Sequence, residues 1–152
     1  MYRTLFERKY LKVSLPSASS LEDIESRLKQ ITWTRDGPLH LYDAISYPET
    51  VWASKKDDCD GFAILASKLL LNLSAKTDPV LVTALVRPVQ KSHTVCVFRQ
   101  AEKLRVFDNK SLCNEVFETY DDVIRMISEG RRLVCWDVVD PRNLKTLAFH
   151  IV

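Results

Sequence analysis

The sequence predicts a single α+β domain, with helices in the first half of the chain and an antiparallel sheet in the second half. Apolar residues recur at helical spacing before residue 74, most strongly over residues 59–73. From residue 79 the period changes, and short runs rich in β-branched and aromatic residues alternate with turns. Strands joined by short turns pair antiparallel, so we expect these runs to form a sheet.

Composition limits the classes of protein that this chain can belong to. Its 152 residues are 46% hydrophobic and 28% charged, which suits one globular domain with a sizeable core. The net charge is +2 and no basic block occurs, so nucleic acid is not an expected partner. No apolar run approaches the roughly 20 residues that span a membrane. The first residues also lack the apolar core of a secretory signal, so we expect a cytoplasmic protein with no membrane partner.

The first helix is predicted over residues 20–31, where apolar side chains recur at helical spacing. Ser19 and Glu22 form a capping-box pattern at its start. The following segment, 32–56, contains glycine, prolines and scattered aromatic residues. It is predicted to be a long, mostly irregular arm with a short helix near 39–45, and arms of this length are usually functional or packed by their own side chains.

The second predicted helix, 59–73, is the strongest helical pattern, and Asp57 or Asp58 can cap it. We expect residues 1–56 to form the N-terminal helix and arm, and residues 57–152 to form the catalytic core of the same domain. The remaining predicted elements are strands at 79–88, 92–100, 103–111, 132–141 and 144–152, with a helix from Thr119 over 120–129 that stops at Gly130.

Cys59 stands at the start of the predicted helix 59–73, among Asp57, Asp58 and Asp60, rather than within its apolar stripe. A helix N-terminus presents unpaired backbone N–H groups and the positive end of the helix dipole, and both stabilise a thiolate. The aspartates oppose this effect, because nearby negative charge disfavours a thiolate. An imidazolium beside the sulfur would resolve the conflict by forming an ion pair, so this position predicts a nucleophile that works with a histidine.

Three histidines are available, and His93 is the best placed to act as the base. His150 is two residues from the C-terminus and His40 lies in the predicted arm. His93 begins an apolar strand beside a turn, where its ring can point into a cleft. On a strand it shares one face with Val95 and Val97, so it would end a row that faces the core.

A nucleophile and base usually need a third group that orients the imidazole. Asp108 ends the next strand of the predicted sheet, 15 residues after His93, a separation that suits one hairpin. An antiparallel neighbour can reach beside His93 at this point. Strand ends next to a helix N-terminus therefore provide a place where Cys59, His93 and Asp108 can meet.

These three segments, "DDCDGFAILASKLL", "SHTVCVF" and "LRVFDN", together resemble the transglutaminase-like cysteine peptidase superfamily, whose catalytic logic is that of papain. The resemblance covers about residues 50–110. It implies a papain-like α+β fold, in which a core helix bearing the cysteine packs on an antiparallel sheet bearing the histidine and the aspartate. Carried over position by position, it implies Cys59 as nucleophile, His93 as general base and acid, and Asp108 as the orienting group.

The resemblance implies acyl transfer at an amide through an acyl-thioester, with a protein or peptide substrate and no cofactor or metal. Peptide-bond cleavage is the leading expectation, and transamidation or deamidation of a glutamine would use the same intermediate. Papain relatives carry a glutamine upstream of the cysteine as oxyanion donor, but "TVWASKK" contains none. Trp52 is the candidate in its place, with the backbone N–H of Cys59 as second donor, although packing is the more common role of a tryptophan.

Two other interpretations remain open. The chain could be a catalytically idle binding or structural module that keeps the fold, for example in a phage or another protein assembly. It could also use several cysteines in redox or zinc chemistry, but no CxxC pair occurs. Cys96 and Cys135 are expected in the core and Cys113 partly exposed, all as thiols. The aspartates around Cys59 lack the spacing of a calcium loop and are read as capping residues.

Overall fold

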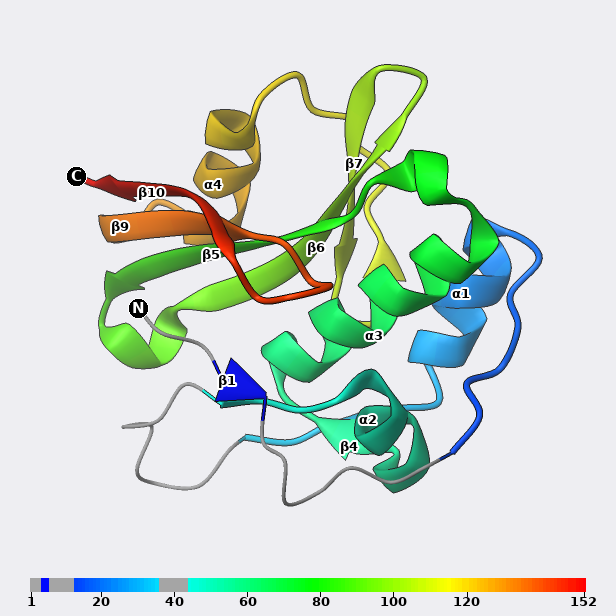
Figure 1. Cartoon of the computed structure of the whole chain (residues 1–152). Helices are drawn as coiled ribbons and strands as arrows, with labels where there is room; N and C mark the ends of the chain where they lie inside the picture. Colours follow the sequence, from blue (N-terminus) through cyan, green and yellow to red (C-terminus); the bar gives the residue numbers. More distant parts are fainter. Residues whose placement is uncertain (1–3, 6–12, 36–43) are drawn as a thin grey trace.

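The structure is a computed structural model in which residues 4–5, 13–35 and 44–152 are described. It is an α+β fold built on a six-stranded antiparallel sheet with the strand order β10-β9-β5-β6-β7-β8 (Figure 1). Two further two-stranded parallel pairs are β1 with β3 and β2 with β4. The helices are α1 (Leu21–Leu28), α2 (Pro48–Ser54), α3 (Cys59–Leu73) and α4 (Tyr120–Ser128); the strands are β1 (Thr4–Leu5), β2 (Thr32–Trp33), β3 (Ala44–Ile45), β4 (Lys56–Asp57), β5 (Val80–Arg87), β6 (His93–Gln100), β7 (Lys103–Asp108), β8 (Ser111–Leu112), β9 (Arg132–Val139) and β10 (Thr146–Ile151).

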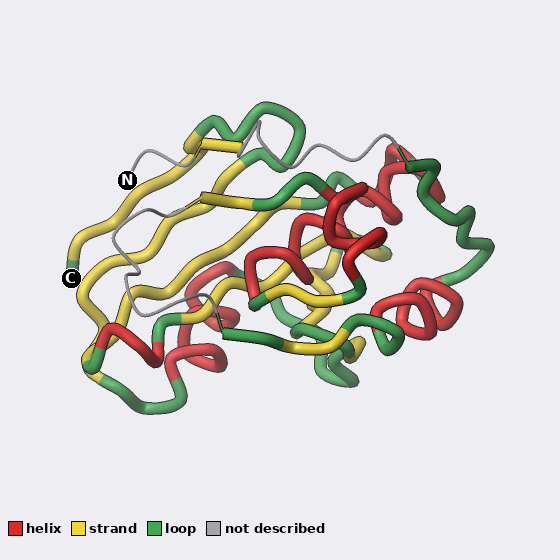
Figure 2. Tube along the Cα trace, turned by 90° about the horizontal axis from the view of Figure 1, so that it is seen from below, coloured by secondary structure: helices red, strands yellow, loops and turns green. Residues whose placement is uncertain are grey.

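The large sheet is covered by helices on both faces, and Figure 2 shows its strands side by side as a twisted layer. Alternate residues of a strand point to opposite faces, so β5, β6, β7 and β9 each contribute to two separate apolar clusters. On one face Cys96, Phe98 and Phe107 pack with α1 and α3. On the other face Val95 and Val97 pack with α4. The predicted class, a core helix packed on an antiparallel sheet, is confirmed.

Helix α3 has the bounds that its apolar pattern predicts. Asp58 caps it by accepting a hydrogen bond of 3.1 Å from the backbone N–H of Asp60. The helix packs on β6 and β7 below it and on α1 and α2 beside it, so its residues are buried on nearly every side. This helix of 15 residues lies at the centre of the core. Within the described ranges, no helix combines the length and apolarity needed to cross a bilayer.

The hairpin of β6 and β7 fixes the register between the two strands that carry His93 and Asp108. Gln100 pairs with Lys103, and the two residues between them both have positive φ, 49° and 64°. Turns of this kind match the right-handed twist of paired strands. The register then continues without a shift to the pair Cys96 and Phe107, so the start of β6 lies beside the end of β7.

Helix α4 agrees with its predicted ends. Thr119 and Asp122 form a capping box, in which each side chain accepts a hydrogen bond from the backbone N–H of the other residue. Glu129 and Gly130 end the helix with φ of 49° and 72°, a conformation that favours glycine. Val123 and Ile127 bury the inner face of this helix against the sheet.

The N-terminal elements differ from the prediction in three places. The N-cap of α1 is Ser20 rather than Ser19, and the helix ends at Leu28 because the next residues form a tighter turn, with the N–H of Ile31 bonded to the carbonyl of Leu28. Ile45 is in a strand, so the short helix expected near 39–45 is wrong there; its residues 39–43 lie outside the described residues. The arm also contains a helix that was not predicted, α2, which Pro48 opens.

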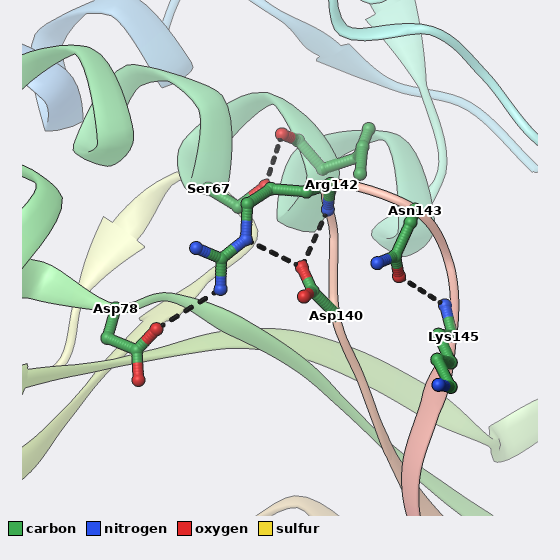
Figure 3. A network of polar contacts seen from close by, with 7 residues as sticks. Ser67, Asp78, Asp140, Arg142, Asn143 and Lys145 are labelled. Atoms are coloured by element: carbon green, nitrogen blue, oxygen red, sulfur yellow. Dashed lines mark hydrogen bonds and ion pairs between the residues drawn. The ribbon is translucent and has the colours of Figure 1, made fainter.

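Ion pairs and hydrogen bonds of one arginine link the turn after β9 to the connection between α3 and β5 (Figure 3). Arg142 binds Asp140 through Nε at 2.9 Å and Asp78 through Nη2 at 3.3 Å. Burial alone would raise the pKa of Asp140, but the hydrogen bonds and charge of Arg142 outweigh it and hold that pKa below its ordinary value. Arg142 and Asp78 are solvent-exposed, so their ion pair adds little to the stability of the fold, whereas Asp140 is mostly buried.

Candidate active site

Cys59 is the first residue of α3, at the position that its motif predicts. Its side chain is partly buried, and all four cysteines, which lie within the described ranges, are thiols. The turn that presents it is built by aspartates, because Asp57 accepts a bond of 2.9 Å from the N–H of Asp58, which in turn caps Asp60. The sequence therefore folds locally so that the thiol stands at the N-terminal end of the core helix.

Gly61 explains how the first turn of α3 approaches β4 so closely. A Cβ placed on Gly61 would lie 2.2 Å from Cγ of Asp57, which is far shorter than any real contact. Glycine is therefore the residue that lets the Asp57 carboxylate lie against the helix. This close approach sets the position of the two residues between Asp57 and Asp60, one of which is Cys59.

His93 and Asp108 are in direct contact. His93 is the first residue of β6, Asp108 is the last residue of β7, and Nε2 of the ring lies 2.6 Å from Oδ1 of the carboxylate. The two side chains are 22% and 33% exposed, so the pair is partly shielded but open to solvent. After Asp108 the chain turns at Asn109, which has φ of 48°, and enters β8.

The three predicted residues occupy the ends of neighbouring elements. Val95 and Val97, which share the face of His93, belong to the cluster under α4, whereas α3 covers the opposite face. His93 is the first residue of that row, and its side chain is partly exposed, whereas Val95 and Val97 are fully buried. The structure thus brings His93 and Asp108 into contact. Helix α3, which begins at Cys59, packs on the two strands that carry them.

The other three thiols are poor candidates for a nucleophile. Burial raises the pKa of Cys96 far above its ordinary value. Burial also raises the pKa of Cys113, and the charges of Asp108 and Glu115 add to that effect. The pKa of Cys135 is raised by burial and by Asp137. Cys96 is fully buried as predicted, whereas Cys135 is only partly buried because β9 lies next to the edge strand β10.

Trp52, the candidate oxyanion donor, lies on α2 and packs against the core around α3. The ammonium of Lys55 sits over the face of its ring. This packing is sufficient to explain why a tryptophan occupies position 52, without a catalytic role. That its indole N–H donates to an oxyanion stays a prediction. Of the other histidines, His150 stacks on Trp136 in the edge strand pair β9 and β10, and His40 lies outside the described residues.

Sequence reasoning missed the strand that holds the start of α3 in place. Strand β2 pairs in parallel with β4, with Thr32 opposite Lys56 and Trp33 opposite Asp57. The N–H of Thr32 donates to the carbonyl of Lys55 at 2.8 Å, and the N–H of Thr34 donates to the carbonyl of Asp57 at 2.9 Å. Strands of two residues carry no period, so no sequence pattern could have indicated them.

The fold is transglutaminase-like. Among solved structures, the chain is similar to LapG of Legionella pneumophila, with a TM-score of 0.51 and 17% identity over 76% of this chain and 62% of LapG. Calcium-bound LapG gives a TM-score of 0.53 and 16% identity over 82% and 69% of the two chains. EGTA-treated LapG gives 0.51 and 16% over 78% and 63%.

The chain spans between 62% and 69% of the LapG chains that it matches. No protein-family model and no curated protein sequence matches it. Because the identity is only 16–17%, the likeness establishes the fold alone.

Proposed function

We propose that this chain is a thiol-dependent peptidase or amidohydrolase in which Cys59, His93 and Asp108 form a catalytic triad. The observation that carries the proposal is the contact of 2.6 Å between His93 and Asp108, on the two strands against which the helix of Cys59 packs. A carboxylate in this place holds an imidazole in one orientation and tautomer. The fold shared with LapG agrees with this chemistry at the level of the class.

In this proposal the two nitrogens of His93 have separate tasks. Nε2 is engaged by Asp108, so Nδ1 is the nitrogen that exchanges the proton with the thiol. The Cys59 thiolate attacks the amide carbonyl, and protonated Nδ1 then donates its proton to the departing amine. The backbone N–H of Cys59, at the helix N-terminus, is one proposed donor to the oxyanion, and Trp52 is the other. Water or an amine completes the reaction by releasing the acyl group.

Alkylation by iodoacetamide tests the proposal before any substrate is known. We expect Cys59 to react rapidly at and below neutral pH in the wild type and much more slowly in His93→Ala, because the imidazolium stabilises the thiolate. The raised pKa values of Cys96, Cys113 and Cys135 keep these groups protonated near neutrality, so their alkylation should increase only at alkaline pH. Mass spectrometry of the four cysteine peptides across pH gives each rate separately.

The same measurement separates catalysis from the alternative of an idle module. If Cys59 follows the profile of an ordinary thiol with a pKa of about 8.5, or does not react, the triad does not operate and a binding or structural role is the better account. If Cys59 is activated, peptide substrates and glutamine-plus-amine pairs can be compared. The first pair of outcomes distinguishes enzyme from module, and the second distinguishes hydrolysis from transamidation.

One of the similar LapG structures is calcium-bound, which raises the question of a calcium site in this chain. Asp60, next to Cys59, has an Oδ1 that is buried and has no hydrogen-bond partner within the described part of the chain. Calcium prefers carboxylate and carbonyl oxygens, and the buried Oδ1 of Asp60 is the oxygen of this turn that would bind it. The described residues contain no group of three or more His, Cys, Asp or Glu side chains that could hold a metal ion, so backbone oxygens and water would complete the shell. When bound, calcium would offset the carboxylate charge beside Cys59.

Calcium binding at Asp60 is expected to stabilise the fold, with Asp58 as a second source of oxygen ligands. At a calcium concentration about 100 times Kd, the midpoint of thermal unfolding should rise by about 5–10 °C. Asp60→Asn should remove most of this shift, whereas Asp121→Asn, which changes an exposed carboxylate in the first turn of α4, should retain it. An equal shift with magnesium, or an unchanged shift in Asp60→Asn, would count against this site.

A further inference from the structure

Trp33 is an exposed aromatic residue that the backbone holds close to Cys59. Its side chain is 49% exposed, although the residue belongs to a strand. Strand β2 is fixed to β4 by the hydrogen bonds of Thr32 and Thr34 described above, and Trp33 lies directly opposite Asp57. Asp57 is two residues before Cys59, so the position of Trp33 relative to the thiol is set by backbone pairing.

The pairing also determines the direction in which Trp33 points. Residues opposite each other in a parallel pair send their side chains to the same face of the ladder. The carboxylate of Asp57 lies against Gly61 in the first turn of α3, so the indole leaves β2 on the side of that turn. With about 4.8 Å between paired strands and about 3.3 Å per extended residue, the Cα atoms of Trp33 and Cys59 are about 12 Å apart or less.

We propose that Trp33 forms a subsite for one apolar side chain of a peptide substrate, within about three residues of the cleaved bond at 3.3 Å per residue. The proposal rests on the proposed function, because it takes Cys59 as the site of cleavage. An extended peptide whose scissile carbonyl lies at Cys59 reaches the indole within that distance. Contact with an exposed indole buries apolar surface, and the free energy of binding is most favourable when the ligand side chain is aromatic or branched aliphatic.

Exposed apolar residues are ordinary on protein surfaces, so Trp33 needs a comparison within the same chain. Phe149 provides it, because it is also aromatic, is equally exposed at 49% and lies on the edge strand β10. Trp52 and Trp136, the other two tryptophans, provide internal reference signals for spectroscopy. Of the two equally exposed aromatic residues, Trp33 is the one that is paired with the residues immediately before Cys59.

The test uses a blocked heptapeptide of glycine and serine with one central phenylalanine, and the matched peptide with glycine at that position. Titration into Cys59→Ala protein is followed by the three indole N–H signals in ¹⁵N–¹H NMR spectra, assigned with Trp33→Phe. The phenylalanine peptide should shift the Trp33 signal saturably and bind about tenfold more tightly than the glycine peptide. Trp33→Ala should remove this preference, and Phe149→Ala should leave it intact.

A second readout connects the subsite to the thiol. Saturating phenylalanine peptide should slow alkylation of Cys59 by iodoacetamide in the wild type, and Trp33→Ala should lose that protection. The NMR titration does not depend on reactivity, so an unreactive Cys59 would contradict the proposed function while the Trp33 signal still reports on peptide binding. A Trp33 signal that does not move, or an equal loss of preference in Phe149→Ala, would overturn the subsite.

Discussion

Asp108→Asn is expected to lower kcat/KM for amide cleavage by about three to four orders of magnitude, as loss of an orienting carboxylate does in triad enzymes. The contact of 2.6 Å with Nε2 of His93 is the physical reason. A carboxylate accepts the ring N–H and favours the imidazolium, whereas an amide can turn its NH₂ group toward the ring and stabilise the wrong tautomer. The measurement is the rate on an amide substrate identified by screening a peptide library.

An activated ester is the matched control for Asp108→Asn. The nitrophenolate of 4-nitrophenyl acetate leaves without a proton, so acylation by this ester depends less on His93 as an acid and should fall much less. Asp108 is 33% exposed, so the variant should unfold within a few degrees of the wild type. Equal losses on amide and ester would argue that Asp108 supports the structure of the site rather than proton transfer.

Phe107→Ala is expected to have the largest effect on stability, lowering the free energy of unfolding by about 3–5 kcal/mol. Phe107 is 1% exposed and stacks on Phe98 with ring centroids 5.5 Å apart, directly under α3. Removing its ring leaves a cavity between the helix and the sheet, and the strand that carries Asp108 loses its anchor. Denaturant unfolding followed by circular dichroism measures the change.

Two further variants define what the Phe107 result means. Phe107→Leu keeps most of the apolar volume and should lose much less stability than Phe107→Ala. Val116→Ala, at a residue that is 57% exposed, should stay within about 0.5 kcal/mol of the wild type. If Phe107→Ala unfolds at nearly the wild-type denaturant concentration, Phe107 is not part of a close-packed core and the account of the two apolar clusters is wrong.

The larger elements could be predicted because each repeats a period over many residues. Helix α3 was predicted with its observed bounds from apolar spacing and an aspartate cap, and the central strands from runs of β-branched residues. Helix α2 was missed because Pro48 was interpreted as a sign of irregular structure. Proline at the first position of a helix followed by Glu49 was the available signal for a helix start.

The candidate site likewise contains contacts between residues that are near in the sequence, which could be predicted, and contacts between distant segments, which could not. His93 and Asp108 lie on the two strands of one hairpin, which is joined by a short turn and has no register shift. Their spacing in the sequence was therefore enough to predict the contact. The exposure of Trp33 and its pairing with Asp57 depend on two short strands that are distant in the sequence. Such pairing is decided by tertiary packing, which single-sequence patterns do not contain.

The parallel pair of β2 and β4 has a consequence for how the site forms during folding. Its two strands are separated by a long segment, and the chain must pay the entropy of closing that loop before Thr34 can bond to Asp57. Helix α3 can begin to form from local contacts, but the position of its first residue is fixed only when this distant strand docks. We therefore expect the position of Cys59 to become fixed late in folding, because it depends on a distant strand as well as on its own helix.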